Sequence, residues 1–438
     1  MKFFQRFLLL VSLLAVSSLT NAQLVNGRFS TSVYAWQQFD TVGVSQTLAR
    51  GFQTLQLEVS QGDVSLRTSM YGATNFSQSF GNDGLIRINN LYLRWKNIED
   101  AMDLSLGRIP VFAGVGNGTL DGALIKARGM DERVWFTAYG GANVLPDLKS
   151  MSFSDLDQKF LIGSQLITTL IPQARIGVSY VNRHIPRESY WATRPDSLFN
   201  PTTVLIVPDS RAQQAVGVDA RYDQDGAYSV YSRYDYDLNS KYTLRGQFGA
   251  RVQTSDQLAL TGDFIYREPY VPFNSFFTVF PVSPIRELEG GIEYSVSPSY
   301  HAFGRFAYVG YVDALSRRIT VGMNADYGSI SYAGSSGYAG ILNSFYVQGM
   351  YPLLDRTLVP TVGFSYSKYR LSEEATQDDN VFAGSFGAVV RPSSLISVDA
   401  QVQWLHNDIA SHDVRLLVNV NYWFNHNFKF LQHKEASE

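Results

Sequence analysis

Residues 241–253 have the sequence Lys-Tyr-Thr-Leu-Arg-Gly-Gln-Phe-Gly-Ala-Arg-Val-Gln. Alternate positions carry apolar side chains such as Tyr242, Leu244 and Phe248, and the positions between them carry polar ones such as Arg245. Successive side chains of a β-strand point to opposite faces, so a period of two separates these sets. The stretch therefore predicts a strand with one face toward hydrocarbon and the other toward water.

The same alternation recurs along most of the chain and predicts about 22 strands, with about 18 or 20 as alternative counts. The predicted spans are 28–38, 47–60, 63–74, 85–97, 101–109, 120–128, 132–139, 158–171, 173–183, 212–223, 226–237, 241–253, 256–267, 286–297, 299–311, 316–327, 328–336, 341–352, 357–370, 379–391, 394–406 and 411–424. Short turns separate the longer connections 75–84, 110–119, 140–157, 184–211, 268–285 and 371–378. In a membrane barrel this sorting places the short turns and both termini in the periplasm.

An export signal is predicted at residues 1–22. Lys2 and Arg6 form a positive region, residues 7–16 are apolar, and Thr20-Asn21-Ala22 supplies a cleavage site. An apolar stretch of about 10 residues is too short for a membrane-spanning helix. The mature chain is expected to begin near Gln23.

The composition excludes several other classes. The chain contains 0 Cys, which rules out thiolate metal sites and Cys nucleophiles. The formal net charge of −3 gives no indication of nucleic-acid binding. Mean hydropathy is −0.10, which argues against a helical membrane protein, whereas a barrel conceals its apolar residues in alternation.

These patterns predict an all-β fold, a transmembrane antiparallel up-and-down β-barrel with no plug domain. The predicted organisation is a signal peptide at 1–22, the barrel at 23–424 and a periplasmic tail at 425–438. A soluble β-sandwich also alternates, but a mature chain of this length without a domain break exceeds an ordinary sandwich. A propeller would show one motif per blade, and the sequence has none.

Two segments carry family resemblances. The strand from Val414 to Phe424 resembles the C-terminal assembly signal of Gram-negative outer-membrane proteins, although residues 425–438 follow the aromatic residue. The segment 104–127, with Gly107-Arg108 and Asp121-Gly122 around a Gly-rich loop, looks like a strand–loop–strand unit of porin-like barrels. These resemblances imply an outer-membrane location and, as partners, membrane lipid, lipopolysaccharide, the assembly machinery and small solutes.

Charged residues on the predicted inward rows are the candidate pore-lining set. Three carboxylates on one row of strand 286–297 cannot face lipid at acceptable cost, so that row is expected to face water. The candidates are Arg67, Arg108, Asp121, Arg245, Arg251, Asp263, Glu287, Glu289, Glu293 and Arg318. Such mixed charges could form a field across an aqueous pore or fill a closed barrel with salt bridges. Arg108 and Asp121 could meet near a constriction, hold an inward-folded loop, or form a structural pair at a strand end.

Catalytic and metal sites are weakly indicated. The chain has 6 His, and the densest group is His406 and Asp408 with His412 and Asp413 around a polar hairpin tip. Glu373-Glu374 and Asp378-Asp379 could attract Ca²⁺, although a solvated acidic loop is the favoured explanation. No enzyme activity, cofactor or metal is predicted.

The leading hypothesis is a porin-like channel for passive diffusion of small solutes. The alternative is a non-transporting barrel that displays its long loops for adhesion or partner binding, and an outer-membrane hydrolase is the least favoured function. A barrel of about 22 strands is wide, so either inward loops narrow it or it conducts strongly. The candidates are 110–119, 184–211 and 268–285, and the last is expected to pack at the barrel mouth because it is rich in Pro and Phe.

Overall fold

The computed structural model describes residues 23–41, 44–77, 85–144, 156, 159–185, 189–195, 197–206, 212–269, 283–312, 314–338, 340–372, 376–408, 410 and 412–428. No helix in these ranges is long and apolar enough to cross a membrane. The predicted signal peptide and most of the 268–285 loop lie outside the described residues.

The described chain forms 24 strands. Their bounds are β1 Gln23–Thr41, β2 Val44–Gln61, β3 Val64–Asn75, β4 Leu85–Ile98, β5 Met102–Ala113, β6 Gly116–Gly129, β7 Val134–Asn143, β8 Phe160–Thr168, β9 Ala174–His184, β10 Tyr190–Pro195, β11 Pro201–Ile206, β12 Ala212–Gln224, β13 Tyr228–Asp237, β14 Tyr242–Gln253, β15 Leu258–Arg267, β16 Ile285–Ser297, β17 Tyr300–Gly310, β18 Leu315–Ala325, β19 Gly328–Gly337, β20 Ile341–Met350, β21 Leu358–Arg370, β22 Asp379–Ser393, β23 Ile396–His406 and β24 Asp413–Phe428.

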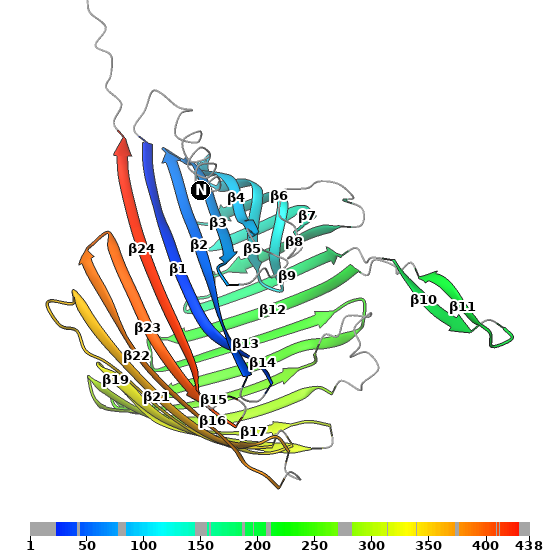
Figure 1. Cartoon of the computed structure of the whole chain (residues 1–438). Coiled ribbons are helices and arrows are strands. Elements are labelled where there is room, and N and C mark those ends of the chain that lie inside the picture. The colour runs from blue at the N-terminus through cyan, green and yellow to red at the C-terminus, as the bar shows by residue number, and fades with distance from the viewer. Residues whose placement is uncertain are drawn as a thin grey trace, which may run out of the picture.

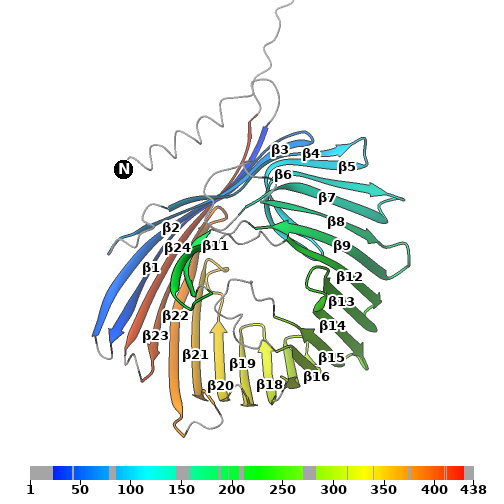
Figure 2. The ribbon, with the colours of Figure 1, turned by 90° about the vertical axis from the view of Figure 1, so that its right-hand side faces the viewer.

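A 22-stranded antiparallel sheet contains all of these strands except β10 and β11. Each strand pairs with its neighbours in sequence, and β9 pairs directly with β12 across the β10–β11 segment. The sheet closes because β1 pairs with β2 on one side and with β24 on the other. Figure 2 shows the resulting ring of strands, and Figure 1 shows β1 beside β24. The predicted closed antiparallel barrel is therefore confirmed.

Each of the 22 predicted strands has a counterpart in the sheet, but several ends differ. The first strand begins at Gln23 rather than at residue 28, and the last ends at Phe428 rather than at Phe424. The two differences have one cause, since the additional residues of β1 and β24 pair with each other, from Gln23 opposite Phe428 to Asn26 opposite Asn425. Residues 425–428 thus belong to the barrel, and residues 429–438 lie outside the described part.

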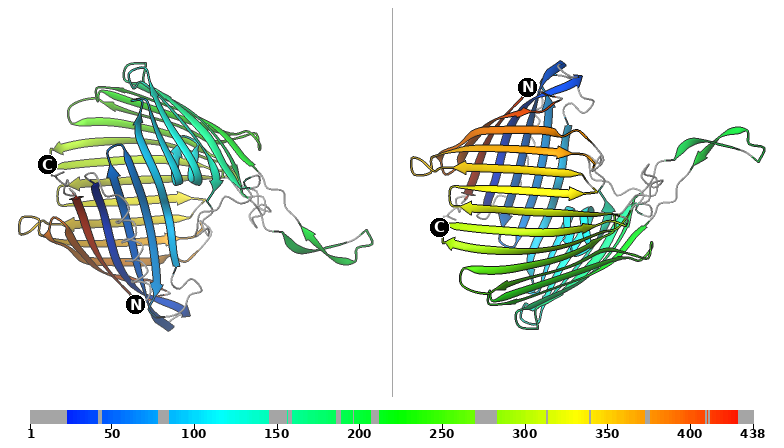
Figure 3. Two further views of the ribbon diagram at one scale, coloured as in Figure 1. Left: turned by 90° about the horizontal axis from the view of Figure 1, so that it is seen from above. Right: turned by 90° about the horizontal axis from the view of Figure 1, so that it is seen from below.

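The segment 184–211, predicted to be a loop, contains a separate hairpin. Strands β10 and β11 pair only with each other and extend away from the barrel (Figures 1 and 3). The described part of this segment therefore does not narrow the lumen as expected. Trp191, Leu198 and Phe199 of the hairpin are largely exposed.

The two faces of the wall follow the alternation of β24. Val420 and Tyr422 lie on its exposed apolar row. The alternate residue Asn421 accepts a hydrogen bond from Ser30 Oγ at 2.5 Å and donates one to Ser397 Oγ at 3.3 Å. The apolar row suits lipid and the polar row suits a watery interior. We call the polar side of the sheet the inner face.

Val420→Arg should destabilise the inserted barrel by about 2–4 kcal/mol near the bilayer midplane. The cause is a charge placed on the lipid-facing row at the middle of β24. Asn421→Arg, one residue further on, should cost only about 1 kcal/mol through its lost hydrogen bonds. Urea unfolding in lipid bilayers measures both values, and equal losses would show that the faces are wrongly assigned.

A glycine lies at the seam, which is the pairing of β1 with β24 that closes the barrel, and it allows these two strands to approach closely. Gly27 of β1 lies directly opposite Phe424 of β24. A Cβ atom at Gly27 would lie 2.5 Å from Phe424 Cζ and 2.6 Å from the carbonyl oxygen of Gln56. Because one of these atoms is backbone, a side chain at Gly27 would displace the neighbouring strand. The phenyl ring of Phe424 occupies the space that a side chain would take.

Gly27→Ala should therefore destabilise the barrel by about 1–3 kcal/mol, the usual cost of overpacking. Gly290 of β16 is the matched control, because a Cβ there would meet nothing within 4 Å. Gly290→Ala should be neutral or slightly stabilising. The same unfolding measurement applies, and a neutral Gly27→Ala would argue against tight packing at the seam.

Candidate functional site

The tip of the β5–β6 hairpin leaves the barrel wall. Strand β5 pairs with β4 only as far as Arg108 opposite Leu91, and β6 pairs with β7 only from Leu120 opposite Asn143. Beyond these points β5 and β6 still pair with each other up to a turn at residues 114–115. We call residues 109–119 the inward hairpin.

Apolar side chains fasten the inward hairpin to the inner face. In β8, Ile162 and Leu166 are exposed on the outer row, whereas Leu161 is completely buried on the inner row. One buried cluster joins Ile109, Val111, Ala113 and Leu120 of the hairpin and its base to Leu124, Tyr139, Leu161, Val181 and Ala215 of the wall. The wall residues come from β6, β7, β8, β9 and β12, so the hairpin tip lies over several neighbouring strands inside the barrel.

Polar contacts fix the tip of the hairpin. The backbone N–H of Val115 donates to Ser179 Oγ at 2.9 Å, and Arg233 Nη2 donates to the carbonyl oxygen of Gly114 at 3.3 Å. Gly114 has a φ of +62°, and a Cβ there would lie 2.1 Å from Ser179 Oγ. Only glycine suits both the turn and this close approach. The tip is therefore attached to β9 and β13.

The row of the inward hairpin that points away from the wall carries an exposed aromatic side chain. Phe112 lies between the buried residues Val111 and Ala113 and is 84% exposed. It stands opposite Asn117, whose carbonyl oxygen accepts a hydrogen bond from Arg183. Since the buried row of the hairpin contacts the wall, Phe112 on the other row faces the interior of the barrel.

A buried ion pair lies at the base of the inward hairpin. Arg108 Nε donates to Asp121 Oδ1 at 2.8 Å, and Arg108 Nη2 donates to Asp121 Oδ2 at 2.9 Å. Arg108 Nη1 also donates to the carbonyl oxygen of Ile88 at 3.1 Å, on the strand from which β5 departs. Both side chains have 0% exposure. Such a bidentate pair is strong and geometrically specific.

The predicted contact between Arg108 and Asp121 is present, but the two side chains do not line a pore. A side chain with no exposed surface does not contact the lumen, so the pore-lining assignment of these two is wrong. Their position, where β5 leaves β4, matches the alternative in which they hold an inward-folded loop. The segment 110–119, predicted to be a loop, is instead mostly strand.

Carboxylates of β16 form ion pairs with arginines on nearby strands. Arg318 Nη2 lies 2.8 Å from Glu289 Oε2 and also contacts Glu287. Arg251 Nε lies 3.2 Å from Glu293 Oε2, and Arg305 Nη2 lies 3.7 Å from Glu293 Oε1. These contacts run along the wall and not across the barrel, because β14 to β18 are successive strands of the sheet.

The remaining candidates of the β13–β15 region have uncharged partners. Tyr231 donates from its hydroxyl to Asp263 Oδ1 at 2.7 Å, and Gln247 Nε2 donates to the Tyr231 hydroxyl oxygen at 2.6 Å. Arg245 donates to Gln247 Oε1. Asp263 and Arg245 therefore belong to one hydrogen-bonded row of the inner face.

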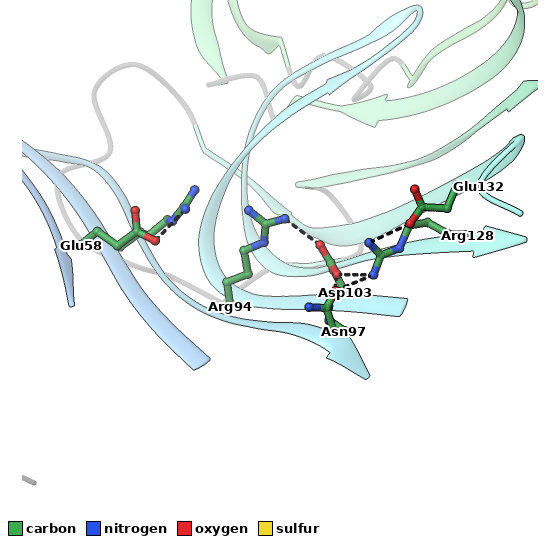
Figure 4. Close-up of polar contacts among 7 residues, drawn as sticks. Glu58, Arg94, Asn97, Asp103, Arg128 and Glu132 are labelled. Atoms are coloured by element: carbon green, nitrogen blue, oxygen red, sulfur yellow. Dashed lines mark hydrogen bonds and ion pairs between the residues drawn. The ribbon is translucent and has the colours of Figure 1, made fainter. Parts of the chain in front are cut away.

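A second network lies on β2 to β6. Arg67 Nη2 lies 2.7 Å from Glu58 Oε1. Asp103 lies between two arginines, 2.6 Å from Arg94 Nη2 and 3.3 Å from Arg128 Nη2 (Figure 4). Asp103 is not among the predicted pore-lining residues, although its alternation with the apolar neighbours Met102 and Leu104 would have placed it on the inner row.

The described histidines show no metal-binding cluster. The rings of Trp404, His406 and His412 lie close together, with 6.1 Å between the two histidine centroids. No group of three or more His, Cys, Asp or Glu that could hold a metal ion occurs within the described ranges. Elsewhere, Ser295 Oγ lies 3.0 Å from His301 Nδ1 at a bulge of β16.

Asp378 is already neutralised by basic neighbours. Arg370 Nε lies 2.8 Å from Asp378 Oδ1 and Lys368 Nζ lies 3.0 Å from Oδ2. Hydrogen bonds from Arg370 and Lys368 lower the pKa of this carboxyl below its usual value. A carboxylate held by two cations has little remaining attraction for Ca²⁺, which argues against cation binding at Asp378. Glu373 and Glu374 lie outside the described residues.

No family model matches this chain, and no curated protein matches it. Among solved structures, the chain is similar to the ferric enterobactin receptor PfeA of Pseudomonas aeruginosa, with 10% identity, coverage of 93% of this chain and 81% of that one, and a TM-score of 0.57. It is also similar to a chain of the E. coli P pilus tip assembly intermediate PapC-PapD-PapK-PapG, with 8% identity, coverage of 92% of this chain and 61% of that one, and a TM-score of 0.51.

A third similar structure is OccAB4 of Acinetobacter baumannii, with 10% identity, coverage of 93% of this chain and 99% of that one, and a TM-score of 0.43. Identities this low establish the fold and not the activity. The chain therefore has a closed 22-stranded antiparallel β-barrel fold, and its likeness to PfeA is a likeness of fold alone.

Proposed function

We propose that this protein is an outer-membrane channel for passive diffusion of small solutes, with the inward hairpin as its constriction. The observation that carries the proposal is the inner face itself, which combines a polar, ion-paired wall with a hairpin fastened to one side of it. An exposed phenyl ring on that hairpin faces the interior. No covalent chemistry or cofactor is part of the proposal.

The exposure of the ion pairs favours an aqueous pore over a barrel closed by salt bridges. Arg251, Arg305 and Arg318 have side-chain exposures of 42%, 45% and 41%. Charges that filled a closed barrel would be buried, as Arg108 and Asp121 are. Wall-bound and half-exposed pairs suit a surface that water wets, where they can set selectivity for passing ions and solutes.

The proposed setting is the outer membrane, with lipid and lipopolysaccharide around the apolar row. The short turns and both ends of the barrel would face the periplasm, and assembly machinery would recognise the C-terminal strand during biogenesis. These proposals follow from the sequence resemblance and from the closed barrel, which is one of the two structures that can span a bilayer.

A barrel that displays its loops is the second candidate function. The β10–β11 hairpin favours it, because Trp191, Leu198 and Phe199 are 69%, 77% and 87% exposed. Large apolar side chains on a projecting element often mark a binding surface. Removal of residues 190–206 should leave conductance unchanged under the channel proposal.

Single-channel recording in planar bilayers tests the proposal. The chain has 0 Cys, so one introduced cysteine reports on one position. A charged thiol reagent should reduce the current through Gln401→Cys on the inner face and leave Val402→Cys, its lipid-facing neighbour, unaffected. A barrel that inserts without conducting, or equal responses of the two variants, would contradict an open pore.

A further inference from the structure

A polar cavity lies on the inner face where β1 pairs with β24. Its volume is about 450 Å³, and residues of β24, β1, β2, β3 and β4 line it. Most of its lining side chains are on the inner rows of these strands. They include Arg28, Arg67, Tyr92 and Trp423, together with amide groups from Gln56 and Asn90.

The cross-strand register sets each arginine beside an aromatic residue. Arg28 of β1 is directly opposite Trp423 of β24, and Arg67 of β3 is directly opposite Tyr92 of β4. Directly opposite side chains share one face of the sheet. The cavity therefore has a guanidinium and an aromatic ring on each side, with amide groups between them.

The charges in this cavity do not cancel. Glu58 forms an ion pair with Arg67 at 2.7 Å. Within the described part of the chain, no carboxylate forms an ion pair with Arg28. Among the described residues that line the cavity, two guanidinium groups therefore face one carboxylate, which leaves a surplus of one positive charge.

Trp423 lies on the inner row of β24 rather than on its lipid-facing row. It is 37% exposed and lies on the inner row, between Tyr422 and Phe424 of the lipid-facing row. Membrane-interface anchoring, the usual role of tryptophan in such proteins, does not explain an indole on the watery side. Exposed aromatic faces next to hydrogen-bonding groups suit a ligand that has both C–H and hydroxyl groups.

The cavity also adjoins the proposed constriction. Tyr92 packs against the apolar cluster of the inward hairpin. It lies opposite Gly107, where β5 begins to leave the wall. A solute held in the cavity would therefore be beside the base of the hairpin.

We propose that this cavity is a solute-binding subsite for a small, singly charged organic anion that carries several hydroxyl groups, such as a sugar acid. The carboxylate would pair with Arg28, the ring or carbon chain would lie against Trp423, and the hydroxyls would bind the amides. This inference rests on the proposed function for its biological role, but binding itself does not require an open channel.

Titration calorimetry on the full-length protein in detergent tests the site. The probes are gluconate, glucose with similar hydroxyls but no charge, and acetate with the charge alone. Gluconate should bind more tightly than either. Arg28→Gln should weaken gluconate binding by about tenfold or more, because it removes a charge-assisted hydrogen bond to the carboxylate. Trp423→Leu should also weaken it.

Arg305→Gln is the matched control, since it removes the same charge from the inner face outside the cavity. Equal losses in Arg28→Gln and Arg305→Gln would show a general effect of lumen charge and overturn the site. Absence of gluconate binding to folded wild-type protein, or unchanged binding in Arg28→Gln, would overturn it too. Failure of the channel proposal would appear separately, as binding without conductance.

Discussion

Asp121→Asn should destabilise the barrel by about 3–5 kcal/mol, because it leaves the Arg108 guanidinium charged and uncompensated in a fully buried position. Neither side chain has exposed surface, so water cannot replace the lost carboxylate. The inward hairpin should loosen at its base, since Arg108 also joins β5 to the Ile88 carbonyl where the strands part. Urea unfolding of the folded protein measures the loss.

Two further variants make this result interpretable. Arg108→Met combined with Asp121→Leu removes both charges and should cost much less than the single change. Asp223→Asn breaks an ion pair between Asp223 and Arg221. The two side chains are 42% and 64% exposed, respectively, so this change should cost about 0–1 kcal/mol. A loss in Asp121→Asn no larger than in Asp223→Asn would show that the buried pair does not support the fold.

Removal of the inward hairpin should raise single-channel conductance severalfold. Replacing residues 109–119 with a short turn, while keeping Arg108 and Asp121, would take away the only described segment that lies inside the ring. A barrel of 22 strands is wider than the 16- to 18-stranded porins that already enclose an aqueous channel. Planar-bilayer recording gives the conductance directly.

Point substitutions at Phe112 provide a milder test in case the deletion does not fold. Phe112→Ala should raise conductance and Phe112→Trp should lower it, because the side chain is 84% exposed toward the interior. Neither change touches the buried row that fastens the hairpin. Unchanged conductance in the deletion and in both substitutions would mean that the narrowest point lies elsewhere.

Alternation was sufficient to predict the sheet but not all of its elements. A period of two marks strands with different solvents on their two faces, and this was correct for all the strands of the barrel. Strands β10 and β11 were missed because they are short and are bounded by Pro195 and Pro201. They also lie outside the barrel wall, so their two faces do not meet different solvents. The inward hairpin was read as a loop because Pro110 and several glycines interrupt its pattern.

The sequence predicted which charged residues share a face of a strand, but not which of them form ion pairs. The sequence placed Glu287, Glu289 and Glu293 on one row, but their partners depend on register, which alternation does not determine. The pairing of Arg108 with Asp121 was within reach because one hairpin joins them. Arg28 and Trp423 come from opposite ends of the chain, and only closure of the barrel makes them neighbours.

Joining β1 to β24 makes completion of the fold an all-or-none event. Because β1 is synthesised before β24, the edge of β1 that pairs with β24 has no partner until β24 has been made. Until then, two rows of backbone N–H and C=O groups remain unpaired, and each would cost several kcal/mol in hydrocarbon. A chain that lacks its final strand is therefore not a slightly weaker barrel but an open-edged sheet prone to aggregation.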